Sequence, residues 1–207
     1  MAQPPPPSWL ELLIQGVTSQ IPGIIAGGIL GPLVLELLRR PWLAMKFRAD
    51  ECISRTTERG STMGPARRAW YLRMKVVNRT WRTAKNCKAY LVKIEKQGEG
   101  GGQYASTTYL DAMQLAWSAK GTKENALRGI DLPKGVPQFF DIVSVRENSS
   151  DFRPEVEGWL YRDETLPKEK GTFRVTVYVA GDNMKPRKKR VCFSWDGNIE
   201  NFTAWSA

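Results

Sequence analysis

Between residues 171 and 180 the side chains alternate strictly between apolar and polar. Phe173, Val175, Val177 and Val179 fall on one parity and polar residues on the other. Successive side chains of a β-strand point to opposite faces of a sheet, so this pattern predicts a half-buried strand. The same alternation, less regular, predicts further strands at 41–48, 70–78, 87–95, 113–118, 137–145 and 191–195.

About seven short strands separated by turn residues, with no long helix after residue 40, are typical of an all-β sandwich. Ser54–Arg68 is polar and contains Gly and Pro, which predicts a loop. Leu110–Gln114 and Val156–Tyr161 are interpreted as single helical turns.

The first 40 residues have a different composition. Residues 1–8 form a Pro-rich tail, and Ser8 with Glu11 is a capping-box pattern for a helix that starts at Trp9. Residues 21–35 carry no charged or polar side chain, and a helix of about 20 apolar residues spans a bilayer. The sequence therefore predicts a membrane-anchoring helix over 9–40; a buried helix of a soluble domain is the alternative.

The charges that flank this segment predict its orientation. No Lys or Arg precedes it, whereas Arg39 and Arg40 follow it at the expected membrane interface. The positive-inside rule then places residues 41–207 in the cytoplasm, on a single-pass protein of the cell inner membrane.

Four small residues lie four positions apart in the predicted helix: Ser19, Gly23, Gly27 and Gly31. They share one helix face, and such faces let two helix backbones approach closely. We expect a homo-oligomer formed through this face, although a chance spacing of glycines is the alternative.

The composition also excludes several kinds of chemistry. The chain has no His, so triads and metal sites that need imidazole are impossible, and its three Cys are too widely spaced for a metal knuckle. We expect no cofactor, no metal and no enzymatic activity. Cys87 is predicted to be a buried small hydrophobe, and Cys192 to face away from Val191 and Phe193.

Two acidic features have structural interpretations. Asp141 lies among apolar residues of a predicted strand, so we expect it to form a salt bridge with an arginine. The acidic tract Glu147–Glu157 matches no calcium loop and is predicted to be a solvated loop.

The densest basic run comprises Lys185, Arg187, Lys188, Lys189 and Arg190. It is interpreted as a solvated hairpin tip or as a contact for anionic lipid or an anionic ligand. Nucleic acid is an unlikely partner because no recognition helix or aromatic platform adjoins the run. The chain as a whole has a net charge of +10.

Four segments together resemble a known family: Met74–Asn78, Ala84–Leu91, Ile130–Gly135 and Gly171–Val179. They are similar to strands and turns of CARDB-type and related bacterial immunoglobulin-like domains, over roughly residues 70–195. With one N-terminal span, the chain also resembles small bacterial membrane-anchored proteins. The resemblance implies an immunoglobulin-like sandwich over 41–207 and no catalytic residue.

These observations predict a membrane-tethered interaction module whose sandwich loops bind an unknown protein partner or the membrane lipid itself. The alternative is a membrane effector, in which the sandwich senses a ligand and the Gly-rich helix oligomerises and perturbs the bilayer.

Overall fold

The computed structural model describes residues 40–58, 66–107, 112–118, 128–149, 151–155 and 170–207. The chain divides into two compact units, Met1–Arg40 and Pro41–Ala207, and the fold described below is that of the second. The predicted membrane helix up to Arg39, with its small-residue face, lies outside the described residues. Among the residues described, no helix is long and apolar enough to cross a membrane.

The first sheet is built around the long strand β3 (Arg67–Asn78). One edge of β3 pairs with β1 (Leu43–Lys46) and, further along, with β2 (Ile53–Glu58). The single helical turn α3 (Ala49–Cys52) separates these two short strands. The other edge pairs with β8 (Pro137–Arg146), which pairs in turn with β9 (Phe152–Pro154), and all of these pairs are antiparallel.

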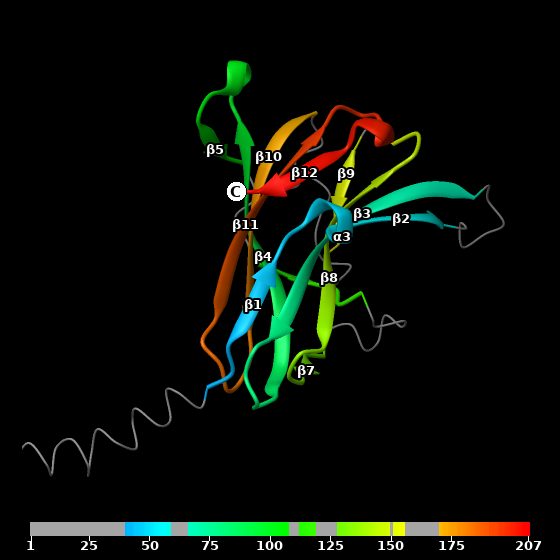
Figure 1. Cartoon of the computed structure of the whole chain (residues 1–207). Coiled ribbons are helices and arrows are strands. Elements are labelled where there is room, and N and C mark those ends of the chain that lie inside the picture. The colour runs from blue at the N-terminus through cyan, green and yellow to red at the C-terminus, as the bar shows by residue number, and fades with distance from the viewer. Residues whose placement is uncertain (1–39, 59–65, 108–111, 119–127, 150, 156–169) are drawn as a thin grey trace, which may run out of the picture. The chain divides into compact units, whose positions relative to one another are not determined.

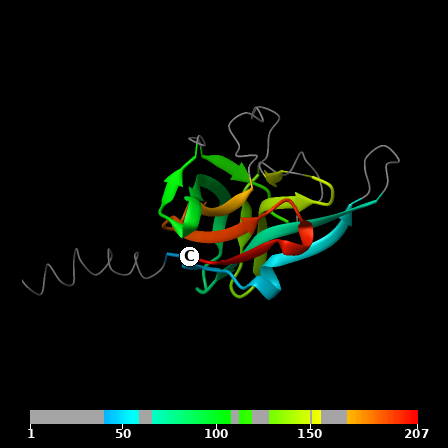
Figure 2. The same ribbon diagram turned by 90° about the horizontal axis from the view of Figure 1, so that it is seen from above.

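The second sheet, also antiparallel, runs in the order β12–β11–β10–β4. These strands are Thr203–Ser206, Arg187–Trp195, Gly171–Ala180 and Ala84–Gln97. The far edge of β4 pairs successively with three short strands: β7 (Ile130–Leu132), β6 (Met113–Leu115) and β5 (Tyr104–Ser106). Figures 1 and 2 show the two sheets lying face to face.

The core lies between the two sheets and is made of the apolar side chains on the inward face of each strand. On β3 it takes Trp70, Leu72, Met74 and Val76, while the intervening side chains are partly exposed. Four phenylalanine rings, three from strands and Phe202 from the last loop, form a cluster in the core. The ring centroid of Phe152 lies 4.8 Å from that of Phe173 and 5.1 Å from that of Phe193. The predicted all-β sandwich of two packed antiparallel sheets is therefore confirmed.

One segment belongs to both sheets. Residues 113–115 pair with β4 of the second sheet, and two residues later Trp117 bridges to Phe140 on β8 of the first. The Trp117 indole N–H donates to the carbonyl of Cys87 (3.1 Å), and its ring meets Phe140 edge-on at 5.5 Å. This crossing ties the two sheets together through a fully buried side chain.

The strands expected from alternation are present, and Gly171–Ala180 has the predicted bounds. The loop predicted for Ser54–Arg68 is wrong in its described parts, because β2 occupies 53–58 and β3 begins at Arg67. As an edge strand beside β3, β2 gains backbone hydrogen bonds without needing apolar side chains on both faces. The helical turn predicted for Leu110–Gln114 is also wrong where it is described, since Met113 and Gln114 are in β6.

Other short strands carry too few residues for an alternation to be detected. β12, at 203–206, was not predicted, nor were β5 and β7. The solvated loop predicted for Glu147–Glu157 is wrong in part, because Phe152 and Pro154 of β9 are buried against the core. Pro154 gives up no hydrogen bond at this sheet edge, where a proline is tolerated.

Candidate functional site

Three connections meet at one end of the sandwich, beside the start of β1 (Figure 1). They are residues 79–83 between β3 and β4, 133–136 between β7 and β8, and 181–186 between β10 and β11. Asn183 joins two of them, because its side chain accepts from the Lys85 amide (2.9 Å) and donates to the Thr83 carbonyl (3.0 Å). The end is therefore a fixed surface rather than three independent loops.

The buried side chain of Asn78 holds the remaining connection. Its amide group donates to the carbonyls of Arg82 (2.6 Å) and Leu132 (2.9 Å), and its oxygen accepts from the Thr80 amide (3.0 Å) and hydroxyl (2.7 Å). All of its polar atoms are satisfied although the residue is fully buried. This network shapes the turn that carries Arg79 and Trp81.

Two tryptophans project from this end. The Trp81 side chain is 87% exposed and that of Trp42 is 58% exposed, whereas Trp70, Trp117 and Trp195 are buried. A cation lies over each exposed ring: the Lys134 ammonium is 2.8 Å from the Trp81 centroid, and the Arg187 guanidinium is 5.1 Å from that of Trp42. Both pairs meet the geometry of a cation–π interaction.

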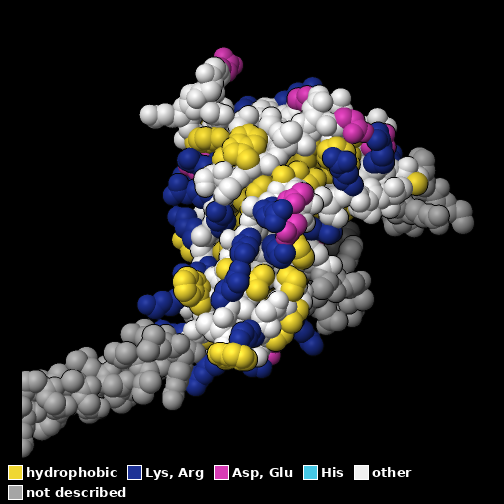
Figure 3. Space-filling view, viewed as in Figure 1, with side chains coloured by type: hydrophobic (Ala, Val, Ile, Leu, Met, Phe, Trp, Pro, Cys, Tyr) yellow, Lys and Arg dark blue, Asp and Glu magenta, His cyan; other side chains and the backbone are white. Residues whose placement is uncertain are grey.

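We call this end the basal surface and define it by six exposed or half-buried residues: Trp42, Arg79, Trp81, Lys134, Val136 and Arg187. Figure 3 shows apolar and basic side chains intermixed over this end of the molecule.

Positive charge prevails at this end. The three connections and their neighbours, residues 79–85, 131–136 and 181–187, contain six basic residues against two acidic ones. One of the two, Asp131, is already bonded to Lys85 (2.6 Å). That bond and the Asn86 amide lower the pKa of Asp131, so this carboxylate stays ionised and paired. The uncompensated charge would attract an anionic partner.

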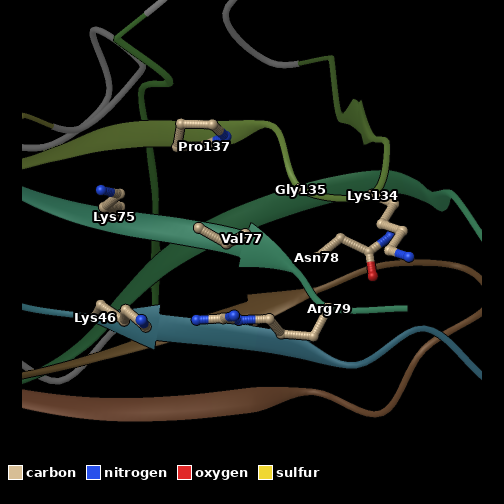
Figure 4. Close-up of a pocket in the computed structure, with 8 residues that line it drawn as sticks. All are labelled: Lys46, Lys75, Val77, Asn78, Arg79, Lys134, Gly135 and Pro137. Atoms are coloured by element: carbon tan, nitrogen blue, oxygen red, sulfur yellow. The ribbon is translucent and has the colours of Figure 1, made fainter. Parts of the chain in front are cut away.

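A shallow pocket of about 350 Å³ opens beside the basal surface, on the outer face of the first sheet. Its lining brings together Lys46, Lys75, Val77, Asn78, Arg79, Lys134, Gly135 and Pro137 (Figure 4). Four of these are cations, and the lining contains no carboxylate. A larger open groove of about 620 Å³ lies between α3, β2 and β12, but its lining has one acid, Asp50, and one base, Arg55.

The structure divides the predicted basic run between two faces of the second sheet. Lys188 and Arg190 pair with Tyr178 and Thr176 on the outer face, whereas Arg187 and Lys189 pair with core-facing Val179 and Val177. Lys185 is exposed in the preceding turn, so four of the five lie in β11 rather than at a hairpin tip. Of the five, only Arg187 contributes to the basal surface; Arg40 is exposed at the end of the first unit.

A second polar cluster covers the outer face of the second sheet. Arg174 donates to Glu95 (2.8 Å) and stacks on the Tyr104 ring at 4.3 Å, and the Tyr104 hydroxyl donates to the Cys192 sulfur (3.5 Å). The hydrogen bonds from Arg174 and Lys93 lower the pKa of Glu95 to about 2. The bond to Cys192, together with burial, raises the pKa of Tyr104 to about 12. Every group in this cluster has a partner, which marks it as structural.

The structure confirms three predictions about single residues. Asp141 accepts from Arg73 (2.7 Å), Cys87 is fully buried, and Cys192 faces away from the core that Val191 and Phe193 enter. Burial raises the pKa of Cys87 to about 12, which suppresses its thiolate. No group of acids and cysteines that could hold a metal ion occurs in the described part of the chain.

Neither the lining of the pocket nor the exposed tryptophans were predicted as site residues. One signal was present: Trp42 follows Arg39-Arg40-Pro41, and Trp81 stands between Arg79 and Arg82 in a turn. A large aromatic residue in a basic turn has no core to enter, which favours a surface role. Lys46, Lys75 and Lys134 line one pocket because of strand register and a turn, and no local signal reports this.

The fold and this surface define a class: an all-β sandwich with a basic, tryptophan-bearing end. The sequence matches no known family model and no curated protein.

Proposed function

We propose that the protein is a membrane-tethered module whose cytoplasmic, immunoglobulin-like sandwich holds its basal surface against anionic lipid of the inner membrane. The observation that carries the proposal is the pair of exposed tryptophans, each capped by a cation, at the end where the chain enters the sandwich. Tryptophan concentrates at membrane interfaces because its ring is apolar and its N–H is polar.

The chain length supports this placement. Trp42 follows Arg40 by two residues, and two extended residues span at most about 7 Å. If Arg39 and Arg40 mark the cytoplasmic interface, Trp42 cannot lie far from the headgroups. Each Lys or Arg near an anionic leaflet adds about 1 kcal/mol of attraction, so the basal charges would hold this end down.

The strand order supports an immunoglobulin-like topology. β3 lies between β1 and β8 in one sheet, and β4, β10 and β11 are neighbours in the other. The same neighbour relations link strands A, B and E, and strands C, F and G, of immunoglobulin domains. The helix-mediated homo-oligomer and the unknown protein partner remain predictions, as does the alternative of a ligand-sensing effector.

The experiment uses the full chain in vesicles that contain brominated lipid, which quenches nearby tryptophan fluorescence. Replacing both Trp42 and Trp81 with Phe is expected to remove most of the quenching that appears when phosphatidylserine is added to phosphatidylcholine. The matched control is Trp205→Phe, because Trp205 is 42% exposed but lies on β12 and outside the basal surface. The proposal would be contradicted if the double variant and Trp205→Phe lost the same amount of phosphatidylserine-dependent quenching.

A further inference from the structure

We propose that the pocket lined by Lys46, Lys75, Arg79 and Lys134 is a binding site for a phosphate monoester group. This inference deepens the proposed function, since the headgroup of an anionic lipid is one source of such a group; a soluble phosphate ester is the other.

The four cations come from four different parts of the fold. Lys46 ends β1, Lys75 lies on β3, Arg79 begins the β3–β4 turn, and Lys134 lies in the β7–β8 connection. Strand register brings the first two together, because Lys46 and Lys75 are direct partners in the β1–β3 ladder. Like charges directly opposite each other in a sheet are destabilising, and a nearby anion relieves that repulsion.

That compensation is incomplete within the protein. Lys75 bonds to Glu51 (2.6 Å), and this bond lowers the pKa of the Glu51 carboxyl. Neither Lys46 nor Arg79 has a carboxylate partner among the residues that the structure describes. Lys134 has none among these residues either, so in the described part of the chain only Lys75 of the four lining cations is paired with an acid.

The side chains also have a suitable arrangement. Figure 4 shows the Arg79 side chain extended along β1 with its guanidinium toward the Lys46 ammonium. A guanidinium can donate two parallel hydrogen bonds to one phosphate, while an ammonium acts as a point charge. Val77 and Pro137 supply an apolar part of the lining, which suits the carbon attached to a phosphate ester.

The backbone around the pocket is fixed before any ligand arrives. Arg79 donates its amide to the Trp42 carbonyl (2.9 Å), and Gly135 donates to the Asn78 carbonyl (2.9 Å). Gly135 has φ +76°, a conformation that favours glycine and turns the chain so that Lys134 borders the pocket. A preorganised site loses less entropy on binding.

The test is amine footprinting of the full chain in nanodiscs, with acetylation of each lysine followed by mass spectrometry. The four samples contain phosphatidylcholine alone, or with phosphatidylserine, with phosphatidic acid at matched charge, or with soluble glycerol phosphate. We expect Lys46 and Lys134 to be acetylated several-fold more slowly with phosphatidic acid or glycerol phosphate than with phosphatidylserine. Protection by phosphatidic acid but not by glycerol phosphate identifies a site for a lipid headgroup. Protection by glycerol phosphate identifies a site for soluble phosphate esters.

Lys185 is the matched control, because it is exposed in the β10–β11 turn but outside the pocket lining. If phosphatidylserine and phosphatidic acid protect all three lysines equally, the basal surface binds anionic lipid but the pocket inference is overturned. If no sample protects these lysines, both the lipid contact of the basal surface and the phosphate site in the pocket are overturned.

Arg79→Gln gives an independent check in the same samples. Loss of a charged hydrogen-bond donor is expected to weaken phosphate-dependent protection of Lys46 about tenfold. Lys185→Gln should leave that protection unchanged. An Arg79→Gln chain that protects Lys46 as well as the wild type would contradict the site.

Discussion

The buried Asn78 side chain donates to the carbonyl of Leu132, 54 residues away, at 2.9 Å. This bond joins β3 to the strand that precedes the β7–β8 connection and so sets the position of Lys134 relative to Arg79. Stability and the candidate site therefore depend on one amide.

Replacing Asn78 with Leu should lower the free energy of unfolding by about 2–4 kcal/mol, because two carbonyls and the Thr80 amide would lose their partner in a buried position. Urea denaturation followed by fluorescence measures the change. Gln103→Ala, at an exposed loop position, should change it by less than about 0.5 kcal/mol. An Asn78→Leu protein as stable as the wild type would show that the network adds nothing.

Trp117→Phe should lower the free energy of unfolding by about 2–3 kcal/mol, because the smaller ring leaves a cavity and the Cys87 carbonyl loses its hydrogen-bond donor. The comparison is Trp205→Phe, whose ring is 42% exposed and which should be nearly neutral. Similar losses in the two variants, measured by urea denaturation, would argue against the role of Trp117 in joining the sheets.

The ion pair between Glu95 and Arg174 should make the free energy of unfolding depend on pH in the acidic range. The pKa of Glu95 is lowered to about 2 in the folded protein, so its contribution is fully present above the unfolded value near 4.5. As the pH falls from about 4.5 to 2, up to about 3 kcal/mol should be lost. Glu95→Gln should reduce the pH dependence of the unfolding free energy over this window, and an unchanged slope would exclude Glu95 as a source of it.

Tyr104 should control the reactivity of Cys192. The Tyr104 hydroxyl donates a hydrogen bond to the Cys192 sulfur, and Cys192 is only 3% exposed. Tyr104→Ala uncovers the thiol, so one cysteine per chain should react about tenfold faster with a thiol reagent under native conditions. The double variant Tyr104→Ala/Cys192→Ser should return to the slow rate. If fast reaction persists in the double variant, the exposed thiol is a different one.

Much of this sandwich could be predicted because its long strands each have one face in the core. β10 and β3 bury every second side chain, which the sequence reports directly. β2 and β12 could not be predicted in the same way, since an edge strand such as β2 (Ile53–Glu58) is stabilised by backbone bonds to its neighbour.

The candidate site was harder to predict for a related reason. The run at 185–190 is conspicuous in the sequence, yet alternation sends its members to opposite faces of β11. The cations that line one pocket, Lys46, Lys75 and Lys134, are separated by up to 88 positions and are brought to it only by register and a turn. Local composition cannot report that kind of proximity.

The crossing of residues 113–118 from one sheet to the other has a kinetic consequence. The packing of the two sheets is complete only once this segment has paired with both, so its contacts couple the formation of one layer to that of the other. This coupling depends on contacts between distant parts of the chain, which are slow to close. Nascent chains would then expose unpaired strand edges for longer than a helical domain of this size.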